Sequence, residues 1–242
     1  MKSALPRTRW LVFLLLALAP VLACAQEVLR RHSGATDPVS EGFKPSLSGG
    51  STVGPLTNDL GVASWEVSSA GYPAGYSLSL TPDEKAKVTG QDVLFAATLR
   101  IVQGHNMFMV LQTGPKRFVL GFDQQPDGDP VVSAESGPPF SLDPVFVLQG
   151  GGPGYHSYEV AYSAATASAA LWVDGVERVG LIPVGSGSWP LGAYWGAFQG
   201  GSAQANWSSV TFAIVPEPSL LALLGWGASL FCPRLWCRRG VA

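Results

Sequence analysis

HSYEVAYSAATASAALWVDGV, residues 156–176, is the stretch of sequence that decides the fold of this chain. Within it, Tyr158–Tyr162 and Ala169–Val173 are short runs rich in aromatic and aliphatic residues, which is typical of β-strands. The Asp174-Gly175 pair favours a type I′ turn, in which one strand reverses into an antiparallel neighbour. The stretch therefore predicts three consecutive antiparallel strands, the last of them being Val176–Leu181.

Strand side chains alternate between the two faces of a sheet. Leu171 and Val173 are therefore expected on the face opposite to Trp172. Further strands are predicted at Tyr76–Leu80, Val93–Val102, Met107–Gln112, Arg117–Phe122, Val131–Ser133, Gly192–Phe198 and Asn206–Ile214. Thr81 followed by Pro82 predicts one short helix, because Thr is an N-cap residue and Pro is favoured in the first helical turn. Together these elements indicate an all-β fold with two antiparallel sheets in a sandwich.

The central part of the chain is acidic and contains no cysteine. Residues 26–215 carry nine Lys or Arg against sixteen Asp or Glu, a formal net charge of −7. This balance leaves no basic patch, which excludes nucleic acid as a partner. Without disulfides the fold must be held by its apolar core. Residues 26–56, rich in Ser, Gly and Pro, are expected to form a loose leader with one edge strand at most, and residues 57–215 the sandwich.

A family resemblance refines this expectation. The pattern His-x-Tyr-x-Val-x-Tyr at residues 156–162, followed by Leu-Trp-Val-Asp-Gly at residues 171–175, is similar to the concanavalin-A-like lectin and laminin-G family. The Ala205-Asn206-Trp207-Ser208 sequence near the last strand fits the same group. The resemblance implies a single jelly-roll of two antiparallel sheets over residues 57–215. It implies no single function, because this fold hosts lectins, glycosidases, adhesion modules and spacers.

The first 25 residues have the order of a secretory signal peptide. A basic start precedes the apolar run 10–19, and Ala23-Cys24-Ala25 is the predicted signal peptidase site before Gln26. The apolar run is shorter than the ~20 residues that a membrane span needs, which favours a cleaved signal helix. A lipoprotein signal acylated at Cys24 is the alternative interpretation.

The last 28 residues resemble a second address signal. Val215-Pro216-Glu217-Pro218 is followed by the apolar run 220–231 and by a basic end that includes Arg238 and Arg239. This order resembles the bacterial PEP-CTERM sorting signal, which a membrane protease called exosortase recognises and removes. A hydrophobic helix over the run would be about 18 Å long, short of a ~30 Å hydrocarbon core. The resemblance implies transient membrane insertion and export to the cell surface or the extracellular space.

Catalytic and metal-binding groups are sparse in this sequence. Glycosidases on this fold need two or three carboxylates on one strand face, and the predicted strands carry no such cluster. We predict no enzymatic activity, with a glycoside hydrolase of unrecognised carboxylates as the alternative. Asp123, Asp127 and Asp129 crowd one loop around Gly128. Their oxygens would suit Ca²⁺, although the same residues are ordinary turn chemistry, and both interpretations stay open.

Trp189, Tyr194 and Trp195 cluster in the Gly-rich segment 185–200. Aromatic faces that stay accessible can stack on sugar rings, whereas buried aromatic rings belong to the core. We predict that these three side chains bind a glycan, with core packing as the alternative. The sequence is thus interpreted as an exported, non-catalytic glycan-binding or structural module whose expected partner is extracellular polysaccharide.

Overall fold

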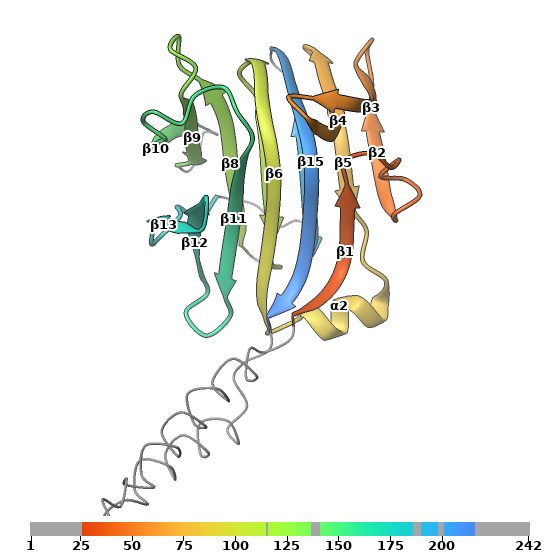
Figure 1. Ribbon diagram of the computed structural model, residues 1–242. Helices are drawn as coiled ribbons and strands as arrows, with labels where there is room; N and C mark the ends of the chain where they lie inside the picture. Colours follow the sequence, from red (N-terminus) through yellow and green to blue (C-terminus); the bar gives the residue numbers. More distant parts are fainter. Residues whose placement is uncertain (1–25, 115, 137–140, 186–189, 198–200, 216–242) are drawn as a thin grey trace, which may run out of the picture. The chain divides into compact units, whose positions relative to one another are not determined.

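Two antiparallel β-sheets pack face to face in the computed structural model of the chain (Figure 1). The structure describes residues 26–114, 116–136, 141–185, 190–197 and 201–215. The strand partners recorded within each sheet run antiparallel, from β1 against β15 to β8 against β9. The predicted all-β sandwich is therefore confirmed.

The first sheet has eight strands. In spatial order they are β13 (Val176–Val179), β12 (Ser168–Val173), β11 (His156–Ser163), β6 (Asp92–Gly104), β15 (Ser202–Val215), β4 (Val62–Ala70) and β3 (Thr52–Asp59), with β1 (Glu27–Ser33) also on β15. The second sheet has seven, in the order β10 (Leu142–Val147), β9 (Pro130–Glu135), β8 (Arg117–Gln124), β7 (Met107–Gln112), β14 (Gly192–Ala197), β5 (Ala74–Leu78) and β2 (Phe43–Leu47).

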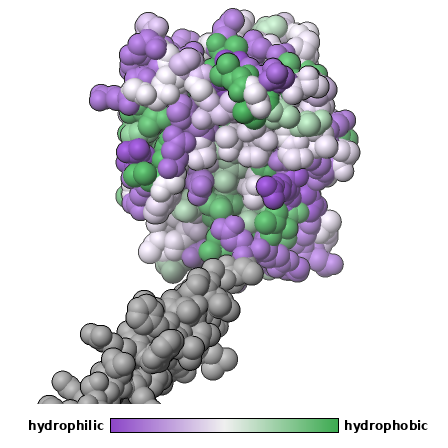
Figure 2. All heavy atoms as spheres, in the orientation of Figure 1, coloured by the Kyte–Doolittle hydropathy of each residue, from purple (hydrophilic) through white to green (hydrophobic). Residues whose placement is uncertain are grey.

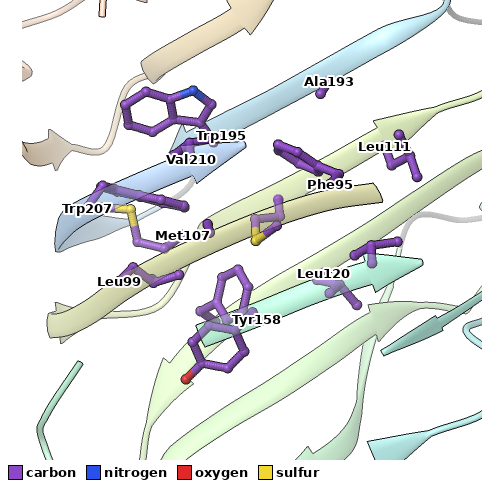
Figure 3. Close-up of a cluster of buried hydrophobic side chains, with 14 of the residues drawn as sticks. Phe95, Leu99, Met107, Leu111, Leu120, Tyr158, Ala193, Trp195, Trp207 and Val210 are labelled. Atoms are coloured by element: carbon purple, nitrogen blue, oxygen red, sulfur yellow. The ribbon is translucent and has the colours of Figure 1, made fainter. Parts of the chain in front are cut away.

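The fold-deciding stretch has the predicted geometry. Asp174 and Gly175 both have positive φ angles, of 50° and 73°, as a type I′ turn requires. Leu171 and Val173 are fully buried, whereas Trp172 on the other face is half-buried. The inward residues of both sheets meet in one apolar core, of which Figure 3 shows the central part.

Strand β15 changes its partner along its length. Its first half pairs with β4, from Ser202 to Trp207, and its second half pairs with β1, from Ser209 to Ile214. The alternation of inward and outward residues shifts by one residue at the same place. Trp207 and Val210 both face the core, although two residues instead of one lie between them. β1 therefore continues the place of β4 beside β15 (Figure 1).

The segment expected to be a loose leader, residues 26–56, differs from the prediction. It forms β1, β2 and most of β3, and it buries His32 and Phe43 completely or nearly so. These strands lie at sheet edges or are mostly exposed, so few of their side chains needed to be apolar. Their positions in the sheets are set by backbone hydrogen bonding to β15, β5 and β4, which local amino-acid composition does not predict.

The predicted short helix is confirmed as α2 (Pro82–Val88). Thr81 caps it, and a capping box joins the Thr81 and Glu84 side chains to each other's backbone N–H groups. Outside residues 26–56, the strands β4 and β10 were also not predicted from the sequence. In the described part of the chain, no helix is long and apolar enough to cross a membrane.

The outward face of the first sheet is a mosaic of polar and apolar residues without one continuous apolar area (Figure 2). The proposed signal-peptide site at Ala23 and Ala25, with Cys24 between them, lies outside the described residues. So do Pro216, Glu217 and Pro218 of the predicted sorting motif, its basic Arg238 and Arg239, and the two terminal helices that the sequence predicts. Gln26 and Val215 are described, and Val215 is the last residue of β15.

Candidate functional site

The outward face of the second sheet carries a groove of about 500 Å³. It crosses four adjacent strands, β5, β14, β7 and β8, and its volume lies in the range typical of small-molecule sites. The described residues that line it are Ser77, Leu78, Ser79, Asn106, Phe108, Val110, Gln112, Arg117, Val119, Pro190, Leu191, Gly192, Ala193 and Tyr194.

The floor of the groove is apolar. Strand β7 is buried on both faces: Met109 and Leu111 belong to the main core, whereas Phe108 and Val110 face outward. Phe108, Val110 and Val119 form a small cluster of their own, against which Leu142 and Tyr194 pack. A second hydrophobic surface therefore lies on the outside of this sheet, where the alternation rule alone would place polar residues.

Tyr194 lies flat along the sheet beside this floor. Its hydroxyl group donates a 2.7 Å hydrogen bond to the carbonyl oxygen of Ala197, three residues further along β14. The ring thereby passes the register pair Gly75 and Gly196, and a Cβ on Gly75 would lie 2.8 Å from the Tyr194 hydroxyl oxygen. Burial raises the pKa of the Tyr194 hydroxyl above its usual range, so the group is a neutral donor.

Glycines make this arrangement possible because they form a row across the sheet. Gly75 pairs with Gly196, Gly196 with Phe108, and Phe108 with Gly121. Phe108 is thus the only side chain among four adjacent positions. Tyr194 occupies the space at one side of it, and Leu142 approaches Gly121 at the other. The result is an apolar platform in which the half-buried Tyr194 and Leu142 side chains flank Phe108, which is 1% exposed.

Polar groups surround the platform. Ser77 and Ser79 contribute hydroxyl groups, Asn106 and Gln112 contribute amides, and Arg117 contributes a guanidinium. Asn106 sits in the β6–β7 turn with a φ of 79°, a conformation that Asn tolerates better than most residues. Hydroxyl and amide groups both donate and accept hydrogen bonds.

Arg117 is held by a buried carboxylate. Its Nε and Nη2 atoms donate to the two oxygens of Glu135, at 3.0 and 2.5 Å. The Glu135 side chain is completely buried and that of Arg117 is 14% exposed. The backbone of Gly185 packs against Glu135 and donates a 2.8 Å hydrogen bond to the Arg117 carbonyl oxygen. The ion pair is therefore part of the wall of the groove.

The three predicted glycan-binding aromatic residues have three different outcomes. Tyr194 lines the groove. Trp195 does not: it is 0% exposed and faces the core from the other side of β14, so its prediction as an accessible platform is corrected. The physical reason is strand alternation, which places neighbours on opposite faces. Trp189 lies outside the described residues.

The three loop aspartates already have partners within the chain. Asp129 accepts hydrogen bonds from the N–H groups of Gly150 and Gly152, which lower the pKa of its carboxyl group. Asp127 accepts one from the Asp129 N–H, and Asp123 contacts His105. Among the described residues, no group of three or more His, Cys, Asp or Glu side chains is placed to hold a metal ion.

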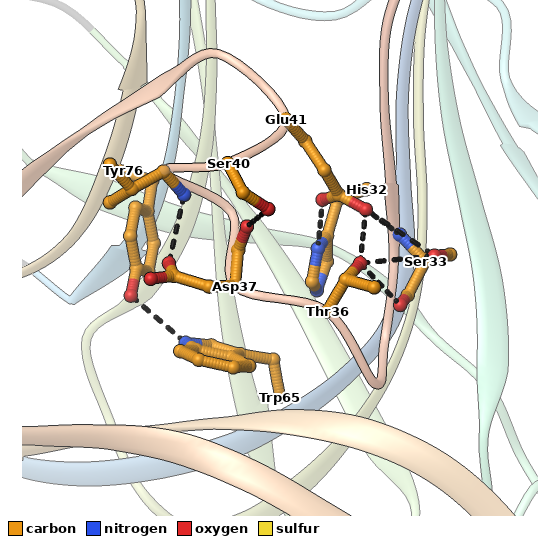
Figure 4. Close-up of polar contacts among 9 residues, drawn as sticks. His32, Ser33, Thr36, Asp37, Ser40, Glu41, Trp65 and Tyr76 are labelled. Atoms are coloured by element: carbon orange, nitrogen blue, oxygen red, sulfur yellow. Dashed lines mark hydrogen bonds and ion pairs between the residues drawn. The ribbon is translucent and has the colours of Figure 1, made fainter.

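The three histidines have structural surroundings. His105 lies in the β6–β7 turn, and His156 bonds Asp174 at 2.9 Å beside the type I′ turn. His32, from the segment expected to be loose, is completely buried. Its Nδ1 atom lies 2.6 Å from a carboxylate oxygen of Glu41, which also bonds Ser33 and Thr36 (Figure 4).

A further polar cluster lies on the first sheet, away from the groove. Asp59 accepts hydrogen bonds from Arg100 at 2.8 and 2.6 Å, from Tyr155 at 2.6 Å and from Asn206 at 2.6 Å. The Arg100 hydrogen bond is the largest cause that lowers the pKa of Asp59 to about 2. These hydrogen bonds tie the end of β3 to β6 and β15.

No protein-family model and no curated protein sequence matches this chain. Solved structures do resemble it in fold. A carbohydrate esterase from the Shiga toxin-encoding bacteriophage phi24B superposes with a TM-score of 0.58 at 8% identity, over 79% of this chain and 100% of that chain.

Two botulinum neurotoxin structures are also similar. The binding domain of neurotoxin DC in complex with SialylT gives a TM-score of 0.51 at 6% identity, over 85% of this chain and 52% of that one. A neurotoxin type C structure, described as dependent on two ganglioside molecules for cell entry, gives 0.52 at 7% identity, over 86% and 52%. The chain thus spans about half of the neurotoxin chains. At these identities the likeness shows a shared β-sandwich fold alone.

Proposed function

We propose that this chain is a non-catalytic carbohydrate-binding module, and that the groove on the second sheet is its binding site. The observation that carries the proposal is the half-buried Tyr194 ring, which lines the groove over its apolar floor beside neutral amide and hydroxyl groups. Sugar rings have apolar C–H faces and many hydroxyl groups, so they match both parts of this surface. Two fold neighbours, a carbohydrate esterase and a neurotoxin whose cell entry depends on gangliosides, agree with this class of ligand.

The absence of acids from the described lining supports a binding role over hydrolysis. None of the described residues that line the groove is Asp or Glu, whereas glycoside hydrolysis uses two carboxyl groups about 5–10 Å apart. Glu135 stands behind Arg117 and is completely buried. We therefore expect no release of reducing sugars from any polysaccharide that the protein binds. Release that a single Asp or Glu substitution abolishes would establish a hydrolase instead.

The binding experiment uses the processed protein and an array of bacterial and plant glycans. Tyr194→Ala should lose the signal, and Tyr72→Ala is its matched control, because Tyr72 is 50% exposed and does not line the groove. Gln112→Ala should weaken the signal, with Gln204→Ala as its control on the opposite sheet. An unchanged signal in both groove variants would place the site elsewhere.

We further propose that the sandwich is a concanavalin-A-like jelly-roll that reaches the cell surface or the extracellular matrix. The supporting observations are the signal-like start and the Pro216-Glu217-Pro218 tail. Signal peptidase and exosortase would be its processing partners, with transient membrane insertion of the tail. Intact-mass measurement of protein from the producing cells should show a chain that begins near Gln26 and ends near Pro218. A recovered chain that keeps Arg238 would contradict exosortase processing, and a lipid on Cys24 would show a lipoprotein.

We propose no cofactor for this function. The loop of Asp123, Asp127 and Asp129 is the alternative as a Ca²⁺ site, and the hydrogen bonds that already engage Asp127 and Asp129 count against it. Glycan retention should be the same in millimolar Ca²⁺ and in EDTA. A loss of retention in EDTA that Asp129→Asn reproduces would assign the loop to calcium.

A further inference from the structure

We infer that the groove selects uncharged glycans over acidic ones. This inference rests on the proposed function and adds the chemical class of the ligand. It follows from how the guanidinium of Arg117 is held, from where the next cation lies, and from the kind of polar group that surrounds the platform.

Arg117 is the single charged residue in the described lining of the groove. An arginine recognises a carboxylate best through two parallel N–H bonds from its planar fork. In this structure such a fork already binds the two oxygens of Glu135, through Nε and Nη2. The pair is largely shielded from solvent, because the side chains of Arg117 and Glu135 are 14% and 0% exposed. Its two charges therefore cancel inside the wall, and the groove has no net charge from these residues.

Lys44 is the cation that could compete with this conclusion. It lies on edge strand β2, in register with Ser77 on the groove side of β5. Its side chain is exposed and does not line the groove. Exposed lysines on edge strands also protect a sheet from pairing with other chains. An ion pair formed there would be exposed to water, and therefore weak and sensitive to salt.

The remaining polar groups match a neutral ligand. Ser77, Ser79, Asn106 and Gln112 each offer groups that donate and accept hydrogen bonds. Sugar hydroxyl groups also do both, whereas a carboxylate or sulfate only accepts. The net charge of −7 on residues 26–215 further disfavours acidic polymers at long range. Each of these features favours a ligand without charge.

The test compares retention of the processed protein by neutral and acidic polysaccharides in native affinity gels. The neutral polymers are a β-glucan, a galactomannan and an arabinan, and the acidic ones are alginate, polygalacturonate and hyaluronate. We expect retention by at least one neutral polymer, changed less than twofold between 20 and 500 mM salt. Retention by acidic polymers should be at least tenfold weaker, and Lys44→Gln should alter neither.

Glu135→Gln supplies the positive control. It leaves the Arg117 charge without compensation, so retention by acidic polymers should increase and should decrease again at 500 mM salt. The double variant Arg117→Gln with Glu135→Gln should lose this gain. If Glu135→Gln fails to fold, the wild-type salt series and Lys44→Gln still decide the question.

The outcomes separate the inference from the proposed function. Strong, salt-sensitive retention by acidic polymers that depends on Lys44 or Arg117 would overturn the selection for neutral glycans and leave carbohydrate binding intact. Equal retention by both classes would also overturn the selection. Retention by none of the polymers, together with an empty glycan array, would overturn the proposed function itself.

Discussion

The imidazole ring of His32 stacks on the indole ring of Trp195, with centroids 5.3 Å apart and planes inclined by 22°. The two residues come from different sheets, His32 from β1 and Trp195 from β14. Tyr76 also stacks on Trp195 at 4.7 Å, and Trp207 lies 5.1 Å away. The first strand of the sandwich therefore closes an aromatic cluster that joins the sheets.

This contact predicts that Trp195 contributes to stability rather than to ligand binding. Trp195→Ala should lower the free energy of unfolding by about 3–5 kcal/mol, because it empties a large, fully buried site. Trp172→Ala, on the half-buried face of β12, should cost much less. Urea denaturation of both variants measures the difference. A stable Trp195→Ala variant that has lost glycan binding would contradict this assignment.

The sequence could predict that Tyr194 and Trp195 face opposite ways but could not say which one faces inward. Alternation assigns the inward face only when one of two neighbouring residues is polar and the other apolar, and here both are aromatic. The decision depends on His32 and Tyr76, which pack on Trp195 from distant segments. The orientation also depends on Gly75 and Gly196, which pair across two strands, and this pairing cannot be inferred from the sequence alone.

A second prediction concerns acid. Burial lowers the pKa of His32 below its usual 6.5, against the opposing effect of its hydrogen bond to Glu41. Below about pH 6.5 the unfolded chain therefore binds a proton that the folded chain resists, and the free energy of unfolding falls as the pH falls. The loss of stability should begin between pH 7 and 5, above the range in which Glu41 contributes.

Chemical denaturation of wild type and His32→Gln between pH 7.5 and 5 tests this. The variant should be about 1–3 kcal/mol less stable at pH 7.5, because it loses a buried hydrogen bond and a ring contact. It should also depend less on pH. Both proteins keep His105 and His156, so the difference between the two profiles isolates His32. Parallel profiles would show that His32 does not contribute to the pH dependence.

The strands of residues 92–124 and 156–173 were predictable because they are rich in apolar residues and separated by turn residues. The strands of residues 27–59 were not. β1 and β2 expose most of their side chains and β3 exposes half of them, so their sequences lack the apolar period of a core strand. The groove could not be predicted from the sequence either. Its floor requires apolar residues on both faces of β7, and a continuous apolar run is equally typical of any fully buried segment.

A third prediction concerns the polar cluster on the first sheet. The carboxylate of Asp59 has a pKa of about 2, below its usual 3.8, mainly through its hydrogen bonds from Arg100. Its contribution to stability is therefore present above pH 4 and is lost as the pH falls toward 2. Asp59→Asn should be about 2 kcal/mol less stable than wild type at pH 7 and should approach it near pH 2. Asp143→Asn, an exposed aspartate of β10, is the control.

Urea denaturation at pH 7 and pH 2.5 gives the comparison. The control should stay within about 0.5 kcal/mol of wild type at both values. A loss for Asp59→Asn that is the same at both pH values would mean that packing, and not the charge of Asp59, stabilises the β3–β4 turn.

The last prediction tests whether the glycine row shapes the groove. Gly75 faces the groove side of β5, and a Cβ there would meet the Tyr194 hydroxyl oxygen at 2.8 Å and clash with the carbonyl oxygen of Trp195. Gly75→Ala should therefore push the Tyr194 ring off the sheet. We expect a loss of about 1–3 kcal/mol in stability, the usual cost of overpacking, together with a loss of glycan retention.

Gly54→Ala is the matched control, because it places the same methyl group on β3 where no atom lies within 4 Å. It should leave retention unchanged and should be neutral or slightly stabilising, since Ala restricts the unfolded chain more than Gly does. The comparison separates a general effect of replacing a strand glycine from the specific contact with Tyr194. If Gly75→Ala keeps wild-type retention and stability, the flat position of the Tyr194 ring does not define the groove, and the platform must be built from other side chains.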